Sequence, residues 1–410
     1  MWWRRCIVGL LLLVAMSGCD APSARFEMSL PYYRKLEKEA GADFQFTYQQ
    51  RQDVPDISAA LFGTPDEPLI PAGSGSGIEE VLDLSKLRMA AGAVSSERDG
   101  APHGLYREHC AHCHGVTGNG MGPTASFLNP YPRDYRMGVF KFKSTPKGAR
   151  PTDDDLRKTL VDGINGTAMP SFKLLADTEI DALVEYVKYL SIRGEVERRL
   201  VEDMAFELDV EEPLETSAEF LLEDVVATVV ERWADAESQV SSVPRRPELS
   251  ADESLESIHR GRELFYGTVA NCVKCHGNAQ LGDGERGDYD DWSKDFSDWT
   301  KIESPLDQAK LLSELDTLGG LKPRNIHPRN LRRGVYRGGR RPVDLYLRIL
   351  NGIDGSPMPA ALLKTPDAGP GIKGLTPDDV WDLVNYVQSL PYESMGTVAT
   401  EQEQYKRARM

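Results

Sequence analysis

Two short stretches, Cys110-Ala111-His112-Cys113-His114-Gly115 and Cys272-Val273-Lys274-Cys275-His276-Gly277, decide how this sequence is interpreted. Each contains two cysteines separated by two residues, followed directly by a histidine and a glycine. In a helical turn this spacing places the two thiols one turn apart, with the imidazole beside them. Four of the six cysteines in the 410-residue chain lie in these stretches, so its thiol chemistry is concentrated in one motif that occurs twice.

The sequence after the two motifs also repeats. Each copy has a Pro-Arg element, a Gly-rich turn that ends in Met-Pro, and an apolar face at helical spacing. These elements are Pro132-Arg133, Gly163 to Pro170 and Ile180 to Leu190 in the first copy, and Pro328-Arg329, Gly352 to Pro359 and Val380 to Leu390 in the second. Four matches in the same order indicate two copies of one fold, each closed by an amphipathic helix. No alternating strand pattern of useful length appears in either copy.

We therefore expect an all-α protein with two tandem domains, an acidic helical linker and an extended N-terminal tether. A tether is expected because Pro, Gly and Ser recur before residue 101, where Gly73 to Gly77 reads GSGSG. Only short stretches such as Tyr32 to Gly41 suggest helix, and the segment could wrap over the folded part. The predicted organisation is a signal peptide at 1–18, the tether at 19–100, domain 1 at 101–192, the linker at 193–254, domain 2 at 255–392 with an insertion at about 282–325, and a tail at 393–410.

The linker is strongly acidic, because residues 195–237 contain fifteen Asp or Glu and three Arg. Apolar residues within it keep helical spacing and favour an amphipathic helix that packs on one or both domains. These residues are Leu222, Val225, Val226, Val229 and Trp233. A solvated, partly disordered spacer is the alternative.

The insertion in domain 2 is predicted from the residue numbers of equivalent positions. Their difference between the two copies grows from 162 at the Cys-x-x-Cys-His motif to 196 at the Pro-Arg element, and the added residues include the acidic run Asp288 to Trp299.

A Cys-x-x-Cys-His motif is the attachment sequence of c-type haem. Its two thiols add to the two vinyl groups of the porphyrin, and the histidine binds the iron. We therefore expect two covalently bound haem c groups, one held by Cys110, Cys113 and His114 and one by Cys272, Cys275 and His276. A four-thiolate zinc site is an alternative that leaves both histidines unexplained. A thioredoxin-like dithiol would lie near a βαβ pattern, which this sequence lacks.

With these motifs and closing helices, both copies resemble class I cytochromes c, and the chain resembles a dihaem bacterial cytochrome of lipoprotein type. The resemblance covers somewhat over half of the chain and does not reach the tether, the linker or the insertion. It implies two tandem cytochrome c domains in which a methionine thioether, from the loop before the last helix, is the second axial ligand of the iron. Met169 and Met358 occupy that position. The alternative for a methionine is to fill space in the core.

The resemblance also implies groups around each haem. A backbone carbonyl near a proline after the motif holds the histidine through its other ring nitrogen, and Pro123 is the candidate in domain 1. Arg133 and Arg329 occupy matching places and are expected to pair with haem propionates or, alternatively, to form ordinary surface ion pairs. His327, beside the second Pro-Arg element, is a rival axial ligand.

A histidine and a methionine together saturate haem iron, so this ligand set favours an electron carrier over an enzyme. We expect single-electron transfer between respiratory or periplasmic redox partners, such as a respiratory membrane complex, an oxidase or a dehydrogenase. The alternative is a dihaem peroxidase-type enzyme, or another haem oxidoreductase with one labile axial ligand. A thiol- or sulfur-oxidising cytochrome would need a cysteine or a second histidine as ligand, and no cysteine is left over.

The N-terminus and the charge of the chain predict where it acts. Arg4 and Arg5 precede an apolar stretch, Ile7 to Met16, that is too short to span a membrane and is typical of an export signal. The following Ser17-Gly18-Cys19 resembles the lipobox of bacterial lipoproteins, which implies cleavage before Cys19 and its lipidation. An uncleaved anchor or a plain signal peptide is the alternative.

The net charge of −16 and the lack of a basic stripe exclude a nucleic-acid binder. We expect an exported protein, lipid-anchored on the periplasmic side of a bacterial membrane.

Overall fold

A computed structural model describes residues 24–41, 43–71, 75–94, 104–208, 212, 214–286, 289–290, 302–364 and 373–393. The signal peptide, Cys19, most of the tail and most of the run 288–299 lie outside these residues. Within the described ranges the protein has no β-strand, and isolated bridges are its only β-type pairing, so the all-α prediction is confirmed. None of the described helices is both long enough and apolar enough to cross a lipid bilayer.

The described helices form an N-terminal segment, two units and a linker. The N-terminal segment contains α2 (Leu30–Ala40), α3 (Tyr48–Phe62), α4 (Ile78–Val81) and α5 (Leu84–Ala90). Unit 1, residues 104–208, contains α6 (Leu105–His109), α7 (Ala111–His114), η1 (Ala125–Phe127), η2 (Tyr135–Met137), α8 (Asp153–Asp162) and α9 (Asp177–Phe206). The linker contains η3 (Phe220–Val226), α10 (Ala227–Ala234) and η4 (Glu237–Gln239). Unit 2, residues 251–393, contains α11 (Ala251–Tyr266), α12 (Val273–His276), α14 (Pro305–Thr317), η6 (Leu331–Arg333), α15 (Pro342–Asn351), α16 (Pro377–Ser389) and η7 (Leu390–Tyr392).

The N-terminal segment is folded, so the prediction of an extended tether is wrong for residues 24–94. Its helices α2, α3 and α5 pack on α9 and share one hydrophobic core with unit 1. Apolar side chains at helical spacing, including Tyr33 and Leu36 of α2, are almost completely buried there. Polar contacts add to the packing, because the Tyr186 hydroxyl donates to the Pro65 carbonyl over 3.0 Å and the Lys188 ammonium donates to the Val81 carbonyl over 2.9 Å.

Helix α9 explains why the segment packs where it does. This closing helix of unit 1 continues to Phe206, past the predicted domain boundary at residue 192, and it is buried on nearly all sides. A helix buried all round needs covering elements on its outer face, and the N-terminal segment and the linker supply them. Its buried charged groups have partners: Arg193 pairs with Glu197 over 2.7 Å, and the Trp233 indole of α10 donates to Glu195 over 3.0 Å.

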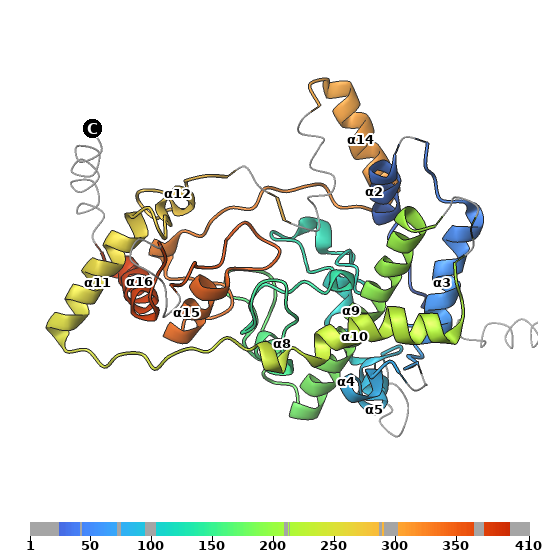
Figure 1. Ribbon diagram of the computed structural model, residues 1–410, viewed down its shortest axis with the longest axis horizontal. Coiled ribbons are helices and arrows are strands. Elements are labelled where there is room, and N and C mark those ends of the chain that lie inside the picture. The colour runs from blue at the N-terminus through green and yellow to red at the C-terminus, as the bar shows by residue number, and fades with distance from the viewer. Residues whose placement is uncertain are drawn as a thin grey trace, which may run out of the picture.

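The linker is helical over residues 220–234, where its apolar side chains pack against the core of unit 1. The chain then runs without regular structure from η4 to α11, along the lower edge of Figure 1. Unit 2 has a hydrophobic core of its own, built mainly on the crossing of α11 and α16. The two helices approach closely at Gly261, where an added Cβ atom would lie 2.0 Å from the Asp382 carbonyl oxygen.

Unit 2 reaches back to unit 1 through its insertion, as the orange trace toward α14 in Figure 1 shows. The Arg324 guanidinium donates to the Ser126 carbonyl over 2.8 Å and lies 3.8 Å from the centroid of the Tyr131 ring. Helix α14 lies beside α2, where Arg34 and Glu314 form an ion pair of 2.8 Å. The two units and the N-terminal segment are therefore in direct contact.

Candidate functional site

Both Cys-x-x-Cys-His motifs form the same short helical turn. The amide of His114 donates to the Cys110 carbonyl over 2.9 Å, and the amide of His276 donates to the Cys272 carbonyl over the same distance. The turn is part of α7 in unit 1 and α12 in unit 2, and a glycine with a positive φ follows each histidine. The backbone thus presents two thiols and an imidazole from one turn in each unit.

The second ring nitrogen of each motif histidine is held by a backbone carbonyl. The Nδ1 atom of His114 lies 3.0 Å from the Arg133 carbonyl oxygen, and the Nδ1 atom of His276 lies 3.2 Å from that of Arg329. The prediction that Pro123 supplies this carbonyl is wrong, because the carbonyl within hydrogen-bond distance of Nδ1 is that of Arg133, and Pro123 is exposed. An N–H bond from Nδ1 leaves Nε2 as the lone-pair nitrogen that can bind a metal.

Burial fixes the protonation of these groups. It lowers the pKa of His114 to about 4, so the imidazole is neutral at physiological pH and able to act as a ligand. Burial also raises the pKa of Cys110 and of Cys272 to about 12, so both are thiols. A redox dithiol needs a cysteine with a lowered pKa, and the four described cysteines form no disulfide. In the described ranges no group of three or more His, Cys, Asp or Glu could hold a metal ion, so the cysteine pairs do not form a shared zinc site.

One cavity of unit 1 brings its predicted ligands together. Cys110, Cys113 and His114 line one side, and Met169 also lines it. Most of the remaining wall is apolar or aromatic and comes from five segments. It includes Leu128, Tyr131, Tyr135, Phe140, Leu156, Leu160, Phe172, Val184 and Val187. A thioether, an imidazole and two thiols on an apolar cavity suit a flat, largely apolar cofactor such as haem.

The two methionine loops have the same backbone geometry. The amide of Ile164 donates to the Met169 carbonyl over 3.1 Å, and the amide of Ile353 donates to the Met358 carbonyl over 3.2 Å. A hydroxyl closes each loop, because Thr167 donates to the Ile164 carbonyl over 2.7 Å and Ser356 to the Ile353 carbonyl over 2.8 Å. Met358 therefore stands in unit 2 where Met169 stands in unit 1. The rival residue His327 is exposed.

Four cations from two equivalent positions in each unit gather between the units. They are Arg133 and Lys141 of unit 1 and Arg329 and Arg337 of unit 2, and eight residues separate the members of each pair. Arg133, Lys141 and Arg337 line the cavity of unit 1, so unit 2 contributes to the wall of the unit 1 site. Asp290 of unit 2 forms an ion pair with Lys141.

This cationic cluster is suited to anionic groups. Burial lowers the pKa of Lys141 to about 8 and that of Arg337 to about 10, and Arg133 and Arg329 respectively add to the lowering. The Nε atoms of Arg329 and Arg337 are buried and have no hydrogen-bond partner among the described residues. Buried donors without partners are rare in folded proteins and fit a ligand with carboxylate oxygens.

Sequence reasoning missed Lys141 and Arg337. The signal was present, because both copies carry a cation eight residues after the arginine of the Pro-Arg element. That Lys141 of unit 1 and Arg337 of unit 2 lie close together depends on how the two units pack, and no local sequence pattern predicts that packing.

Two comparisons with known proteins found matches. A family model described as cytochrome c matches residues 103–191 and 258–391, which is more than half of the chain. A chain from the solved structure of the Kuenenia stuttgartiensis reducing HAO-like protein complex is 25% identical in sequence; the match covers 70% of this chain and 94% of that chain, with a TM-score of 0.43. The comparison with curated proteins found no match.

Proposed function

Because the chain belongs to the cytochrome c family, we propose that it is a dihaem c-type cytochrome that transfers single electrons between redox partner proteins. The observation that carries the proposal is that Cys110, Cys113, His114 and Met169 line one cavity. The family implies covalently bound haem c. That there are two haems, one in each unit, is supported by the second motif and by the matching hydrogen bonds around it.

The proposed roles follow the repeat. In unit 1, Cys110 and Cys113 attach the haem, and His114 and Met169 bind the iron. In unit 2, Cys272 and Cys275 attach the haem, and His276 and Met358 bind the iron. The haem supplies the one-electron change between ferric and ferrous iron. The histidine and the methionine of each unit would hold the iron, the apolar walls would exclude water, and the thioether would raise the reduction potential. No position remains for a substrate, which is why we propose a carrier.

The cationic cluster gives the two haem sites a shared wall. We assign Arg133, Lys141, Arg329 and Arg337 to the haem propionates, an assignment supported by the buried, unpartnered Nε atoms of Arg329 and Arg337. Because the cluster contains residues of both units, the carboxylates of both cofactors would be bound at one interface. An arrangement of this kind favours electron exchange within the chain, so that an electron enters at one haem and leaves at the other.

We further propose that the protein is exported and anchored to the periplasmic side of a bacterial membrane through lipid on Cys19. Its partners would be a respiratory membrane complex, an oxidase or a periplasmic dehydrogenase. The test is fractionation of cells that express the wild-type chain or Cys19→Ser. Wild type is expected in the membrane fraction and to take up labelled fatty acid, whereas the variant is expected to do neither. A wild-type protein recovered only in the soluble fraction would contradict the anchor.

The function itself is tested by a spectroelectrochemical titration of the purified full chain, followed by addition of hydrogen peroxide and a reduced donor. A carrier is expected to give two reversible one-electron steps, a low-spin spectrum in both oxidation states and no peroxidase turnover. High-spin haem at rest together with turnover would overturn the carrier and favour a dihaem peroxidase-type enzyme.

A further inference from the structure

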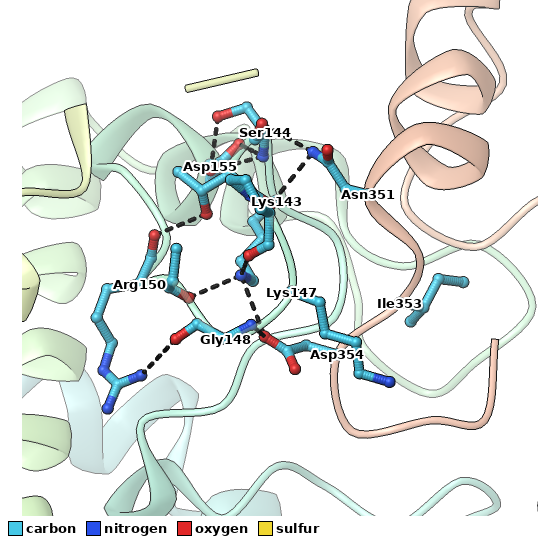
Figure 2. A network of polar contacts seen from close by, with 12 residues as sticks. Lys143, Ser144, Lys147, Gly148, Arg150, Asp155, Asn351, Ile353 and Asp354 are labelled. Carbon is cyan, nitrogen blue, oxygen red and sulfur yellow. Dashed lines mark hydrogen bonds and ion pairs between the residues drawn. The ribbon is translucent and has the colours of Figure 1, made fainter. Parts of the chain in front are cut away.

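Unit 1 contains a segment that unit 2 lacks, and this segment contacts the methionine loop of unit 2. The offset between equivalent residues is 196 at Phe140 and Tyr336 but 189 at Asp155 and Asp344, so unit 1 has seven extra residues between these positions. They belong to the loop 143–150. Figure 2 shows this loop facing Asn351 and Asp354, which flank the turn that leads to Met358.

The strongest contact is a buried ion pair. The Lys143 ammonium lies 3.1 Å from Asp354, and the two side chains are only 4% and 12% exposed. Lys143 also donates to the Ala149 carbonyl over 2.7 Å, so the ammonium is fixed within its own loop. Asp354 accepts a second bond, from the Gly148 amide over 2.8 Å. A largely covered carboxylate that accepts from both an ammonium and an amide of one loop is firmly held.

Further hydrogen bonds fix the two ends of the same turn. The Asn351 amide group donates to the Ser144 carbonyl over 2.9 Å, and its oxygen accepts from the Ser241 hydroxyl over 2.7 Å. On the other side of the turn, Lys147 donates to the Ser356 carbonyl over 2.9 Å. The turn 351–356 is thus bound at its first residue, its middle and its last residue by parts of the chain outside unit 2.

The methionine loop of unit 1 is held differently. Asn165, the equivalent of Asp354, is exposed, and the Met169 amide donates to the Thr167 hydroxyl over 3.1 Å. Among the described residues of unit 2, the Met358 amide forms no such bond to the Ser356 hydroxyl, although that hydroxyl donates to the Ile353 carbonyl as Thr167 does to Ile164. The turn of unit 2 is thus held less by its own loop and more by contacts from outside unit 2.

We propose that the loop 143–150 of unit 1 positions Met358, so that methionine ligation of the second haem depends on the docking of unit 1 through Lys143 and Asp354. The inference rests on the proposed function, since it takes Met358 as the ligand. Lys143 and Asp354 are positioning residues, because they hold the turn that precedes Met358. Lys143 also lines the cavity of unit 1, so Asp354→Asn is the variant that tests the contact without altering that cavity. Loosening their contact frees the turn and lets the thioether leave the iron.

The test compares the full-length wild-type chain with Lys143→Gln, Asp354→Asn and the repeat-matched control Asn165→Ala. Haem content and circular dichroism are measured first, and Asp354→Asn is included because it keeps the size of the side chain. The readouts are the methionine–iron charge-transfer band of the oxidised protein and carbon monoxide binding by the reduced protein. Both variants are expected to keep two haems, to lose about half of the band and to bind carbon monoxide at one haem, because one iron would have lost its sixth ligand. The control is expected to match wild type.

The outcomes separate this inference from the function on which it rests. A wild-type spectrum without the methionine band would overturn the proposed ligation itself, and the inference with it. A normal wild-type band that both variants retain in full, with no carbon monoxide binding, would overturn only the positioning role. An equal loss of the band in Asn165→Ala would also overturn it, because the effect would then not depend on the contact between units.

Discussion

The imidazole of His114 and the phenol ring of Tyr135 are stacked, with ring centroids 4.6 Å apart and planes inclined by 13°. Tyr135 lies two residues after Arg133, whose carbonyl binds the Nδ1 atom of the same imidazole. The other face of Tyr135 stacks with Phe140 at 6.0 Å. The segment from Arg133 to Tyr135 therefore fixes the imidazole through both its ring nitrogen and its ring face. Helix α9 packs against η2, which begins at Tyr135.

Tyr135→Ala is expected to lower the free energy of unfolding by about 3–5 kcal/mol, because it removes a buried aromatic ring and leaves a cavity beside the histidine. Tyr135→Phe keeps the ring and is expected to remain within about 1.5 kcal/mol of wild type. Urea unfolding followed by circular dichroism measures both. Equal stability of the two variants would show that the stacked ring contributes nothing to the site.

Arg337→Gln is expected to lower the reduction potential of one haem by an amount on the order of 30 mV, since a nearby cation disfavours the extra positive charge of ferric iron. The effect should fall on the haem of unit 1, whose cavity Arg337 lines. Arg340→Gln is the matched control, because it removes the same charge three residues away from an exposed side chain. Spectroelectrochemical titration of both proteins provides the comparison. A shift of the same size in both would mean that Arg337 acts only through net charge.

Glu185→Gln is expected to change the pH dependence of stability at the joint between α9 and the N-terminal segment. Burial raises the pKa of the Glu185 carboxyl, although Lys188 and the Asp83 amide oppose the shift. With a folded pKa above the unfolded one, the group contributes stability below its ordinary pKa of 4.5 that is lost as the pH rises through the folded pKa. The variant should therefore gain stability relative to wild type as the pH rises above the ordinary pKa of 4.5.

Thermal unfolding of wild type and Glu185→Gln across this pH range gives the measurement, and the exposed Glu231→Gln serves as the control. A stability difference between wild type and Glu185→Gln that stays constant with pH would contradict the assigned shift.

The motifs, the repeat and the closing helices were predictable because each depends on residues close in sequence. Helix α16, Pro377–Ser389, contains most of the predicted apolar face from Val380 to Leu390, and its Thr376 cap is adjacent in sequence. The N-terminal segment differs from the extended tether that its Gly and Ser residues predict, because side chains at helical spacing, such as Val54 and Ile57, are buried. Their burial depends on packing against unit 1, which the sequence of the segment does not specify.

Other features could not come from local patterns. The carbonyl partner of His114 is set by the path of the chain between the motif and Arg133, which spacing alone does not fix. The entry of Arg337 into the cavity of unit 1, and the pairing of Lys143 with Asp354, depend on how two copies of one fold pack against each other. A sequence repeat predicts that the chain contains two copies of one fold. It does not predict which residues of one copy contact the other.

The central claim is that two haems are each bound by a histidine and a methionine of this chain. The most direct test is the near-infrared spectrum of the oxidised full chain, compared with those of Met169→Ala and Met358→Ala at equal protein concentration. We predict a methionine–iron charge-transfer band in wild type that falls by about half in each variant. A band that is missing from wild type, or that one of the two substitutions leaves unchanged, would contradict the account.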